Sequence, residues 1–272
     1  MKAMTKQFPI NIVQITDMHL YGVPHGTLLK MNTKNSLSKV IEVMQGKEKK
    51  INLILATGDI AQDASQTAYE NFIKTINKLK IPFRWIPGNH DNVQTMREVA
   101  AGTPINDKSV VINNWQILLL DSSIKNQVHG KLAPAELDFL EKNLQLMQES
   151  NEIEHGIVCL HHNPVPGTAR WMRDIGLENG PKFFQIIAKY PKVKCVIYAH
   201  IHQELDFIHA GVRCFCTPST CIQFKPNVTG FELDRLNPGY RSLQLYADGR
   251  IESAVVRVEG ETFDADYSSA GY

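Results

Sequence analysis

The sequence lacks any long apolar run and carries almost no net charge. No stretch approaches the ~18 consecutive apolar residues of a membrane-spanning helix, so we expect no membrane span. The chain has 29 basic and 28 acidic residues, a formal net charge of +1, which provides no strong field to attract nucleic acid or a membrane surface. These absences argue against a membrane protein and against a nuclease that binds long nucleic acid.

Cysteine is scarce, and its five occurrences are an odd number. All but one lie in apolar, strand-like runs, namely Cys159, Cys195, Cys214 and Cys216, while Cys221 follows in a loop. This distribution favours reduced packing residues over a disulfide framework. Segment 1–20 has no apolar run before Pro9 and no small-residue cleavage site, so a secretory signal is not expected. We therefore expect a cytoplasmic protein.

Repeats and linkers are also missing. The 272 residues contain no clean repeat, heptad or low-complexity tract, and no linker that would separate two domains. The hydrophobic share of 43% is ordinary for a soluble globular chain. We predict a single domain over residues 1–260. The tail 261–272 is acidic, small and polar, which predicts a flexible C-terminal segment.

What the chain does contain is an alternation of apolar runs and amphipathic stretches. Buried strands are predicted at 10–16, 51–57, 83–88, 110–123, 155–160 and 194–199. Helices are predicted at 33–48, 65–79, 134–149 and 181–190. This alternation indicates an α/β layered fold. Four short strand-like runs at 204–210, 212–218, 241–247 and 251–258 predict a second, more antiparallel sheet.

Polar side chains that can bind metal follow most of these strands. The residues in question are Asp17, His19, Asp59, Asn89, His90, His161, His200 and His202. Because functional residues of an α/β sheet gather beyond the carboxyl ends of its strands, we expect these side chains to meet at one rim. Each motif alone is more typical of a turn, a cap or a hydrogen-bonded histidine. Independent turns, however, have no reason to produce the whole set.

The ligand types narrow the choice of metal. Oxygen and imidazole ligands without thiolate suit manganese, iron or zinc. Seven candidate ligands are too many for one tetrahedral ion, but they fit two ions ~3.5–4 Å apart that share one carboxylate. Such a pair holds a hydroxide at neutral pH and stabilises in-line displacement at phosphorus. The sequence therefore predicts a two-metal hydrolase site.

The order of these motifs resembles the calcineurin-like metallophosphoesterase superfamily. The matching residues are Asp17-x-His19, Gly58-Asp59, Gly88-Asn89-His90-Asp91, His161 and His200-x-His202. The resemblance implies a four-layer α/β/β/α sandwich, two mixed sheets flanked by helices, with a dinuclear metal centre on its rim. The chain departs from the pattern at Ala199, which stands where the family usually has glycine. We expect a slight shift of backbone there and no loss of the site.

The resemblance also implies a role for each residue. Asp17, His19 and His202 would hold one ion, Asn89, His161 and His200 the other, and Asp59 would bridge them. His90 would be catalytic and protonate the departing oxygen, since imidazole suits general acid work near neutral pH. Substrate phosphate would lie among His19, Asp59, Asn89, His90 and His202.

The C-terminal third resembles one branch of this superfamily, the class III bacterial cyclic AMP phosphodiesterases. The runs that carry this likeness are "YAHIHQELDFIHAGVRCFCTPSTCIQFKP" and "GYRSLQLYADG". It implies hydrolysis of 3′,5′-cyclic AMP to 5′-AMP by a hydroxide held between the two ions. Two alternatives stay open: a broader phosphodiesterase or phosphatase that acts on other cyclic nucleotides or glycerophosphodiesters, and a metal-bound scaffold without activity. The complete ligand set and His90 argue against the scaffold.

Segment 163–180 has two interpretations. It forms a wall of the substrate pocket, with Trp171 or Met172 against a base and Arg170 or Arg173 near the phosphate, or it is a surface loop that contacts a second copy in a homodimer.

Three neighbouring features complete the expected site. We assign His162 to packing beside the ligands and not to metal binding. Asp91 is expected to cap the helix that follows it, in preference to orienting His90. The residue types of segment 217–226 predict only a polar turn between strands. The resemblance alone implies that this segment borders the site.

Overall fold

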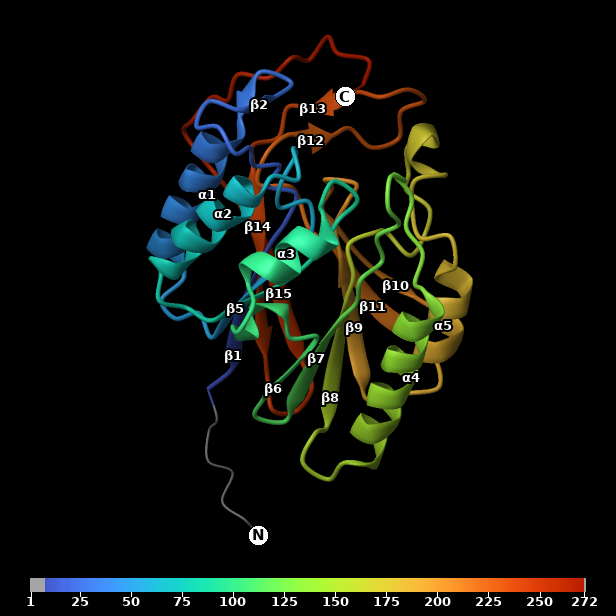
Figure 1. The fold of residues 1–272 in the computed structure, drawn as a ribbon. Coiled ribbons are helices and arrows are strands. Elements are labelled where there is room, and N and C mark those ends of the chain that lie inside the picture. Colours follow the sequence, from blue (N-terminus) through green and yellow to red (C-terminus); the bar gives the residue numbers. More distant parts are fainter. Residues whose placement is uncertain (1–7, 272) are drawn as a thin grey trace.

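Two β-sheets lie face to face between two layers of helices in the computed structural model, which describes residues 8–271 (Figure 1). One sheet has five strands in the order β15-β14-β1-β4-β5, and the other has six in the order β10-β11-β9-β8-β7-β6. Figure 1 shows α1, α2 and α3 on one side of the pair and α4 and α5 on the other. The predicted four-layer α/β/β/α sandwich is therefore confirmed.

The five-stranded sheet combines both ends of the chain. Its strands are β1 (Ile10–Ile15), β4 (Leu53–Thr57), β5 (Phe83–Ile86), β14 (Gly239–Leu245) and β15 (Ile251–Arg257). β1, β4 and β5 are parallel, while β14 pairs antiparallel with β1 and with β15. The helices on its outer face are α1 (Thr33–Lys47), α2 (Gln66–Asn77) and α3 (Val93–Val99).

The six-stranded sheet is parallel at its centre and antiparallel at both edges. Its strands are β6 (Ser109–Ile112), β7 (Trp115–Leu119), β8 (His155–Cys159), β9 (Val193–Tyr198), β10 (Leu205–His209) and β11 (Val212–Cys216). β7, β8, β9 and β11 run parallel, with β6 and β10 antiparallel at the edges. The helices α4 (Pro134–Glu149) and α5 (Gly180–Ile187) cover its outer face.

Short elements connect the layers. They are the strand pairs β2 (Thr27–Leu28) with β3 (Met31–Asn32) and β12 (Gln223–Phe224) with β13 (Leu233–Asp234), and the 3₁₀ turns η1 (Pro104–Asn106) and η2 (Arg170–Met172). In Figure 1, β2, β12 and β13 lie at one end of the sandwich, the end toward which β1 runs.

The alternation of side chains along each strand builds three apolar layers. In β1, Ile10 and Ile12 pack between the two sheets, whereas Val13 and Ile15 pack under the helices. Such alternation follows from the period of two along a strand. The layer between the sheets holds their faces together, and its end carries the polar site.

The predicted C-terminal sheet is wrong. The four late strands do not form a sheet of their own, because β10 and β11 join the six-stranded sheet and β14 and β15 join the five-stranded sheet. Apolar alternation identifies a strand but not the strand beside it. The predicted strand 110–123 also divides into the hairpin β6–β7 around Asn113, whose φ of 53° is a left-handed conformation that asparagine tolerates.

The tail after β15 runs beside the N-terminal part of the chain. Phe263 packs against the buried core, the Asp266 amide donates to the Leu29 carbonyl at 2.8 Å, and the Lys30 ammonium lies 3.2 Å from the Asp266 carboxylate. Its flexibility and the domain boundary at 260 stay predictions. Residues 1–7 of the predicted domain and residue 272 of the predicted tail lie outside the described residues. Over residues 8–271, no helix combines the length and apolar content that crossing a membrane requires.

Candidate metal centre

The structure brings all the predicted ligands to one rim, beyond the ends of five strands. Asp17, His19, Asp59 and Asn89 follow β1, β4 and β5 of the five-stranded sheet, and His161, His200 and His202 follow β8 and β9 of the six-stranded sheet. The site therefore spans the top of the layer between the sheets, and each sheet supplies part of it.

Asp17, His19 and His202 form one group. His202 Nε2 lies 3.3 Å from Asp17 Oδ1 and 3.2 Å from His19 Nε2. One ligand atom from each of the three residues lies within 4.8 Å of the others. This spacing suits a single metal ion coordinated by a carboxylate and two imidazoles.

Asp59 lies between this group and a second one. Its Oδ2 is 3.9 Å from His19 Nε2 on one side and 3.3 Å from His161 Nε2 on the other. His161 Nε2 is in turn 3.3 Å from Asn89 Oδ1, and the ring centroids of His161 and His200 are 5.1 Å apart. Asp59 thus has the place of a carboxylate shared by two metal ions.

Each ligand histidine is held through the nitrogen that faces away from the cluster. In three of them, Nδ1 makes the outer hydrogen bond and Nε2 faces the cluster. The contacts of Nδ1 are His19 to Gln62 Oε1 at 2.6 Å, His161 to the Thr57 carbonyl at 2.8 Å and His202 to the Ile222 carbonyl at 2.8 Å. His200 is reversed, because its Nε2 contacts the Ile175 carbonyl at 2.9 Å. Such outer contacts fix the tautomer and ring orientation of a metal-binding histidine.

Several ligand atoms are buried without a hydrogen bond. Within the described chain, both carboxylate oxygens of Asp17 and the Nδ1 atom of His200 have no hydrogen-bond partner. Buried polar atoms of this kind cost free energy unless another group binds them. A metal ion on each side of Asp59 fits this requirement, so the donor set suits a dinuclear centre.

The backbone is left-handed at five of the ligands. The φ angles are 51° for Asp17, 48° for His19, 50° for Asp59, 70° for His200 and 47° for His202. This conformation is uncommon for residues other than glycine and persists where the surrounding structure enforces it, as at functional sites. The chain therefore bends at the end of each strand to aim these side chains at the cluster.

Glycines make room for the ligands on the five-stranded side. A Cβ atom on Gly58, whose φ is 99°, would lie 2.4 Å from His161 Nδ1, and one on Gly88 would lie 2.1 Å from Asp59 Oδ1. Ala199 keeps a negative φ, is fully buried, and donates its amide to the His161 carbonyl at 3.0 Å. Alanine therefore fits the position where the family pattern has glycine.

Burial and charge set the protonation of the cluster. Burial raises the pKa of the Asp59 carboxyl, but His161 and His90 outweigh it and hold that pKa well below its usual range. Burial lowers the pKa of His161, yet the facing Asp59 carboxylate reverses the effect and raises it to about 9. Burial lowers the pKa of His19 to about 3. The Asp59 carboxylate is thus ionised and His19 neutral, as metal binding requires, whereas a metal ion would displace a proton from His161.

His90 lies beside the ligands at the wall of a cavity. Its ring centroid is 5.1 Å from that of His19, and its backbone amide donates to Asp59 Oδ1 at 2.9 Å. The cavity of about 480 Å³ is lined by His90 and Asn89 on one side and by residues 121 and 123–126 on another. An imidazole in this position can reach a ligand in the cavity as well as the cluster.

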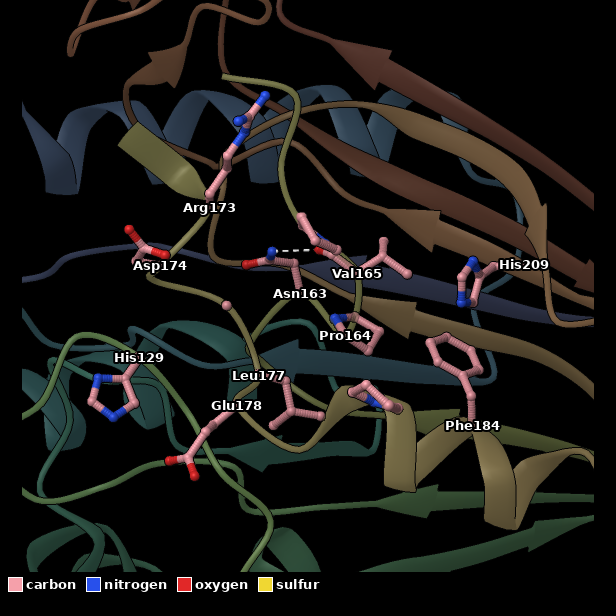
Figure 2. A pocket seen from close by; sticks show the side chains of 13 residues that line it. His129, Asn163, Pro164, Val165, Arg173, Asp174, Leu177, Glu178, Phe184 and His209 are labelled. Carbon is pink, nitrogen blue, oxygen red and sulfur yellow. Dashed lines mark hydrogen bonds between the residues drawn. The ribbon is translucent and has the colours of Figure 1, made fainter. Parts of the chain in front are cut away.

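A second cavity, of about 560 Å³, is lined by none of the predicted metal ligands (Figure 2). Segment 163–178 forms much of its wall, together with His129, Phe184 and His209. Arg173 lines this cavity and not the one that contains His90, and Figure 2 shows its guanidinium directed away from the other labelled side chains. A contact between Arg173 and phosphate stays a prediction.

Met172 and Asp91 do not have the places expected for them. Met172 is fully buried in the core, so it does not lie against a base. Trp171 is half-buried with its ring 5.2 Å from Phe224, and a contact between Trp171 and a base stays a prediction. Asp91 does not cap α3, because Asn92 takes that place. Its carboxylate instead accepts the amides of Ile60, Ala61 and Gly88 at 3.1, 3.0 and 2.9 Å, so it ties the ends of two neighbouring strands together.

One expectation is confirmed and another stays a prediction. His162 lies beside the ligands, with one nitrogen each of His161, His162 and His200 within 4.8 Å of the others. Its Nδ1 bonds Ser122 Oγ at 2.8 Å and its Nε2 bonds the Val128 carbonyl at 3.2 Å, which supports a packing role, and this role stays a prediction. Segment 217–226 borders the site, because the Phe224 ring stacks on the His202 ring with 4.0 Å between centroids and an interplanar angle of 9°. The stacked Phe224 ring thus holds the His202 ring in place.

Comparison with known proteins agrees with this geometry. The family model for calcineurin-like phosphoesterases matches residues 10–204, which include every ligand. The chain belongs to the calcineurin-like phosphoesterase family.

Within this family, the chain is similar to bacterial enzymes over almost its whole length. It is 41% identical to the 3′,5′-cyclic adenosine monophosphate phosphodiesterase CpdA of Pseudomonas aeruginosa, over 96% of this chain and 94% of that protein. It is 40% identical to the protein of the same name from Escherichia coli strain K12, over 97% of this chain and 95% of that protein. Among solved structures, a dimetal phosphatase from Danio rerio has the same fold, with a TM-score of 0.64 and 14% identity over 93% of this chain and all of the other.

Proposed function

We propose that this calcineurin-like phosphoesterase is a dinuclear metal-dependent phosphodiesterase that hydrolyses 3′,5′-cyclic AMP to 5′-AMP. The observation that carries the proposal is the complete set of oxygen and imidazole ligands at one rim. The 41% identity to an enzyme named for this reaction supports the choice of substrate.

Two ions of manganese, iron or zinc would occupy the cluster. Asp17, His19 and His202 would hold the first, and Asn89, His161 and His200 the second, with Asp59 shared. The position of Asp59 Oδ2, 3.9 Å from His19 and 3.3 Å from His161, supports this sharing. When bound, the two ions would activate water for attack on phosphorus and neutralise the charge of the phosphate.

The chain's own residues would bind the phosphate and supply the proton. Asn89 Oδ1 lies 3.3 Å from His161 Nε2, which leaves its amide NH₂ as a donor to a phosphate oxygen. A phosphate bound there would lie among four further residues, namely His19, Asp59, His90 and His202. The His90 ring would donate its proton to the ribose 3′ oxygen as the P–O bond breaks, which leaves the phosphate on the 5′ carbon.

The cavity beside His90 would have room for the nucleoside of the substrate. Its volume of about 480 Å³ lies within the range of small-molecule pockets. We also propose a cytoplasmic location, which the five free and buried cysteines support.

A substrate panel on metal-reconstituted protein tests the proposal. It contains cyclic AMP, cyclic GMP, a 2′,3′-cyclic nucleotide, a glycerophosphodiester and a phosphomonoester. We expect cyclic AMP to be hydrolysed fastest and to yield 5′-AMP. Inert cyclic AMP beside rapid turnover of another ester would favour the broader phosphodiesterase, and no turnover of any ester would favour the scaffold.

Replacement of the proton donor tests the mechanism. His90→Ala is expected to lower kcat for cyclic AMP by about 10²–10⁴-fold, the usual contribution of a general acid. The matched control is His209→Ala, since His209 is exposed at the far end of β10 and does not line the cavity with His90. Full activity of His90→Ala would show that the assigned proton donor is wrong.

A further inference from the structure

The apolar layer between the two sheets becomes polar directly beneath the metal ligands. In β1, Ile10 and Ile12 belong to this layer and Gln14 takes the next position on the same face. The same change occurs where Thr57 ends β4, where Thr217 follows β11 and where Arg241 lies in β14, each fully or almost fully buried. We name Gln14, Thr57, Thr217 and Arg241 the polar clamp.

Gln14 is the hub of the polar clamp. Its Nε2 atom donates to Thr57 Oγ1 at 2.8 Å and to the Tyr198 carbonyl at 3.2 Å, and its Oε1 atom accepts from the Thr217 hydroxyl. Thr57 belongs to the same sheet as Gln14, whereas Tyr198 ends β9 of the opposite sheet. One buried amide therefore bonds strand ends of both sheets.

Arg241 adds a second set of bonds between the sheets. It pairs with Gln14 in the register of β1 and β14, and it is 2% exposed. Its Nη2 atom donates to the carbonyls of Cys216 and Leu205 at 2.8 and 3.1 Å, and its Nε atom donates to Thr217 Oγ1 at 3.2 Å. A buried cation is tolerated only with such bonds, and these acceptors lie on β10 and β11 or just after them.

The bonded strand ends lead directly into the ligands. Tyr198 is two residues before His200, and Thr57 is two residues before Asp59. The Thr57 carbonyl also accepts from His161 Nδ1 at 2.8 Å, across the two sheets. Movement of one sheet against the other would therefore shift ligands of one sheet relative to those of the other.

Apolar packing alone does not set that position sharply. Hydrophobic contacts are non-directional, whereas hydrogen bonds fix both distance and angle. A functional constellation must be held within ~0.5 Å of its working geometry. We propose that the polar clamp sets the spacing between the ligands of the two sheets, with Gln14 as a positioning residue. This inference rests on the proposed dinuclear site.

The test compares Gln14→Met with Gln116→Met in the full chain. Methionine keeps the length of glutamine and removes its hydrogen bonds. Gln116 is also a buried glutamine, and its side-chain amide donates a hydrogen bond to Ser109 Oγ at 2.9 Å. It lies on the face of β7 that is turned away from the opposite sheet. Metal-free protein is titrated with Mn²⁺ and followed by electron paramagnetic resonance, and circular dichroism checks the fold.

We expect wild type and Gln116→Met to bind two Mn²⁺ ions with the spectrum of a coupled pair. Gln14→Met is expected to bind the pair about tenfold more weakly, the lower end of what outer contacts contribute, and to lose the coupled spectrum. Its kcat for cyclic AMP should fall while KM changes little. If Gln14→Met does not fold, Thr217→Val, which keeps the side-chain shape and removes the bonds to Gln14 and from Arg241, should weaken the pair in the same way.

Two outcomes separate the inference from the proposed function. If wild type binds two coupled ions and a folded clamp variant binds them within twofold of Gln116→Met, the polar clamp does not position the ligands. If wild type itself does not bind two ions, the proposed dinuclear site is wrong, and the inference falls with it.

Discussion

The two sheets bring different chemistry to the same rim. The five-stranded sheet supplies every oxygen ligand, namely Asp17, Asp59 and Asn89, together with His19. The six-stranded sheet supplies only histidines, His161, His200 and His202. The negative charge that neutralises bound cations therefore comes from the five-stranded sheet. The six-stranded sheet contributes imidazoles, which bind metal only when their rings are correctly oriented.

The sheets also differ in how they orient their imidazoles. His19 is held by a side chain, Gln62, at 2.6 Å. The three histidines of the six-stranded sheet are held by backbone carbonyls of Thr57, Ile175 and Ile222. Because substitution cannot remove a carbonyl, His19 differs from these three histidines in that its outer hydrogen bond comes from a replaceable side chain.

Loss of the shared carboxylate should have the largest effect. Asp59→Asn keeps the side-chain shape and removes the charge between the two ligand groups. We expect fewer than two Mn²⁺ ions per chain by mass spectrometry and a kcat for cyclic AMP that is more than ~100-fold lower, beyond the range of outer-contact changes. The control is Asp248→Asn, which lies exposed in the turn between β14 and β15. A variant that keeps both ions and most of its activity would show that charge from this sheet is dispensable.

Loss of the side-chain partner of His19 should have a smaller effect. Gln62→Leu frees the ring of His19, so Mn²⁺ affinity measured by calorimetry is expected to fall by about 10–100-fold. Gln66→Leu is the matched control, because Gln66 is exposed and contacts Glu70 on the surface of α2. Equal affinities in the two variants would mean that the sheets do not differ in this way.

Replacement of Ala199 should have the smallest effect. The five-stranded side needs Gly58 and Gly88 beside the ligands, whereas Ala199 on the six-stranded side keeps a negative φ. Ala199→Gly is therefore expected to lower the free energy of unfolding by ~0.5–1 kcal/mol in denaturant titrations. Its kcat should match wild type, and a clear rise in kcat would indicate that alanine constrains this side.

The ligand set could be predicted from the sequence because it depends on short-range rules. Parallel strands place their carboxyl ends on one edge, and the period of two puts His200 and His202 on one face. The structure keeps the first feature only, because β9 ends at Tyr198 and both histidines lie beyond it with left-handed φ angles of 70° and 47°. It also shows that these two histidines present different nitrogens, Nδ1 of His200 and Nε2 of His202.

The remaining features depend on contacts between distant residues. Which nitrogen of His200 faces the cluster is decided by the carbonyl of Ile175, and Gln62 stands out only because its amide meets His19. Met172 was expected as one of two residues that could lie against a base in the pocket wall, yet the core buries it fully. Gln14 gave no signal at all, since a single polar residue in an apolar strand is also typical of a solvent-facing position.

Anomalous diffraction from crystals of the Mn²⁺-loaded protein locates the metal ions themselves. We expect two manganese peaks on either side of Asp59, one beside Asp17, His19 and His202 and the other beside Asn89, His161 and His200. A single peak, or two peaks whose ligands all come from one sheet, would rule out a dinuclear centre built by both sheets.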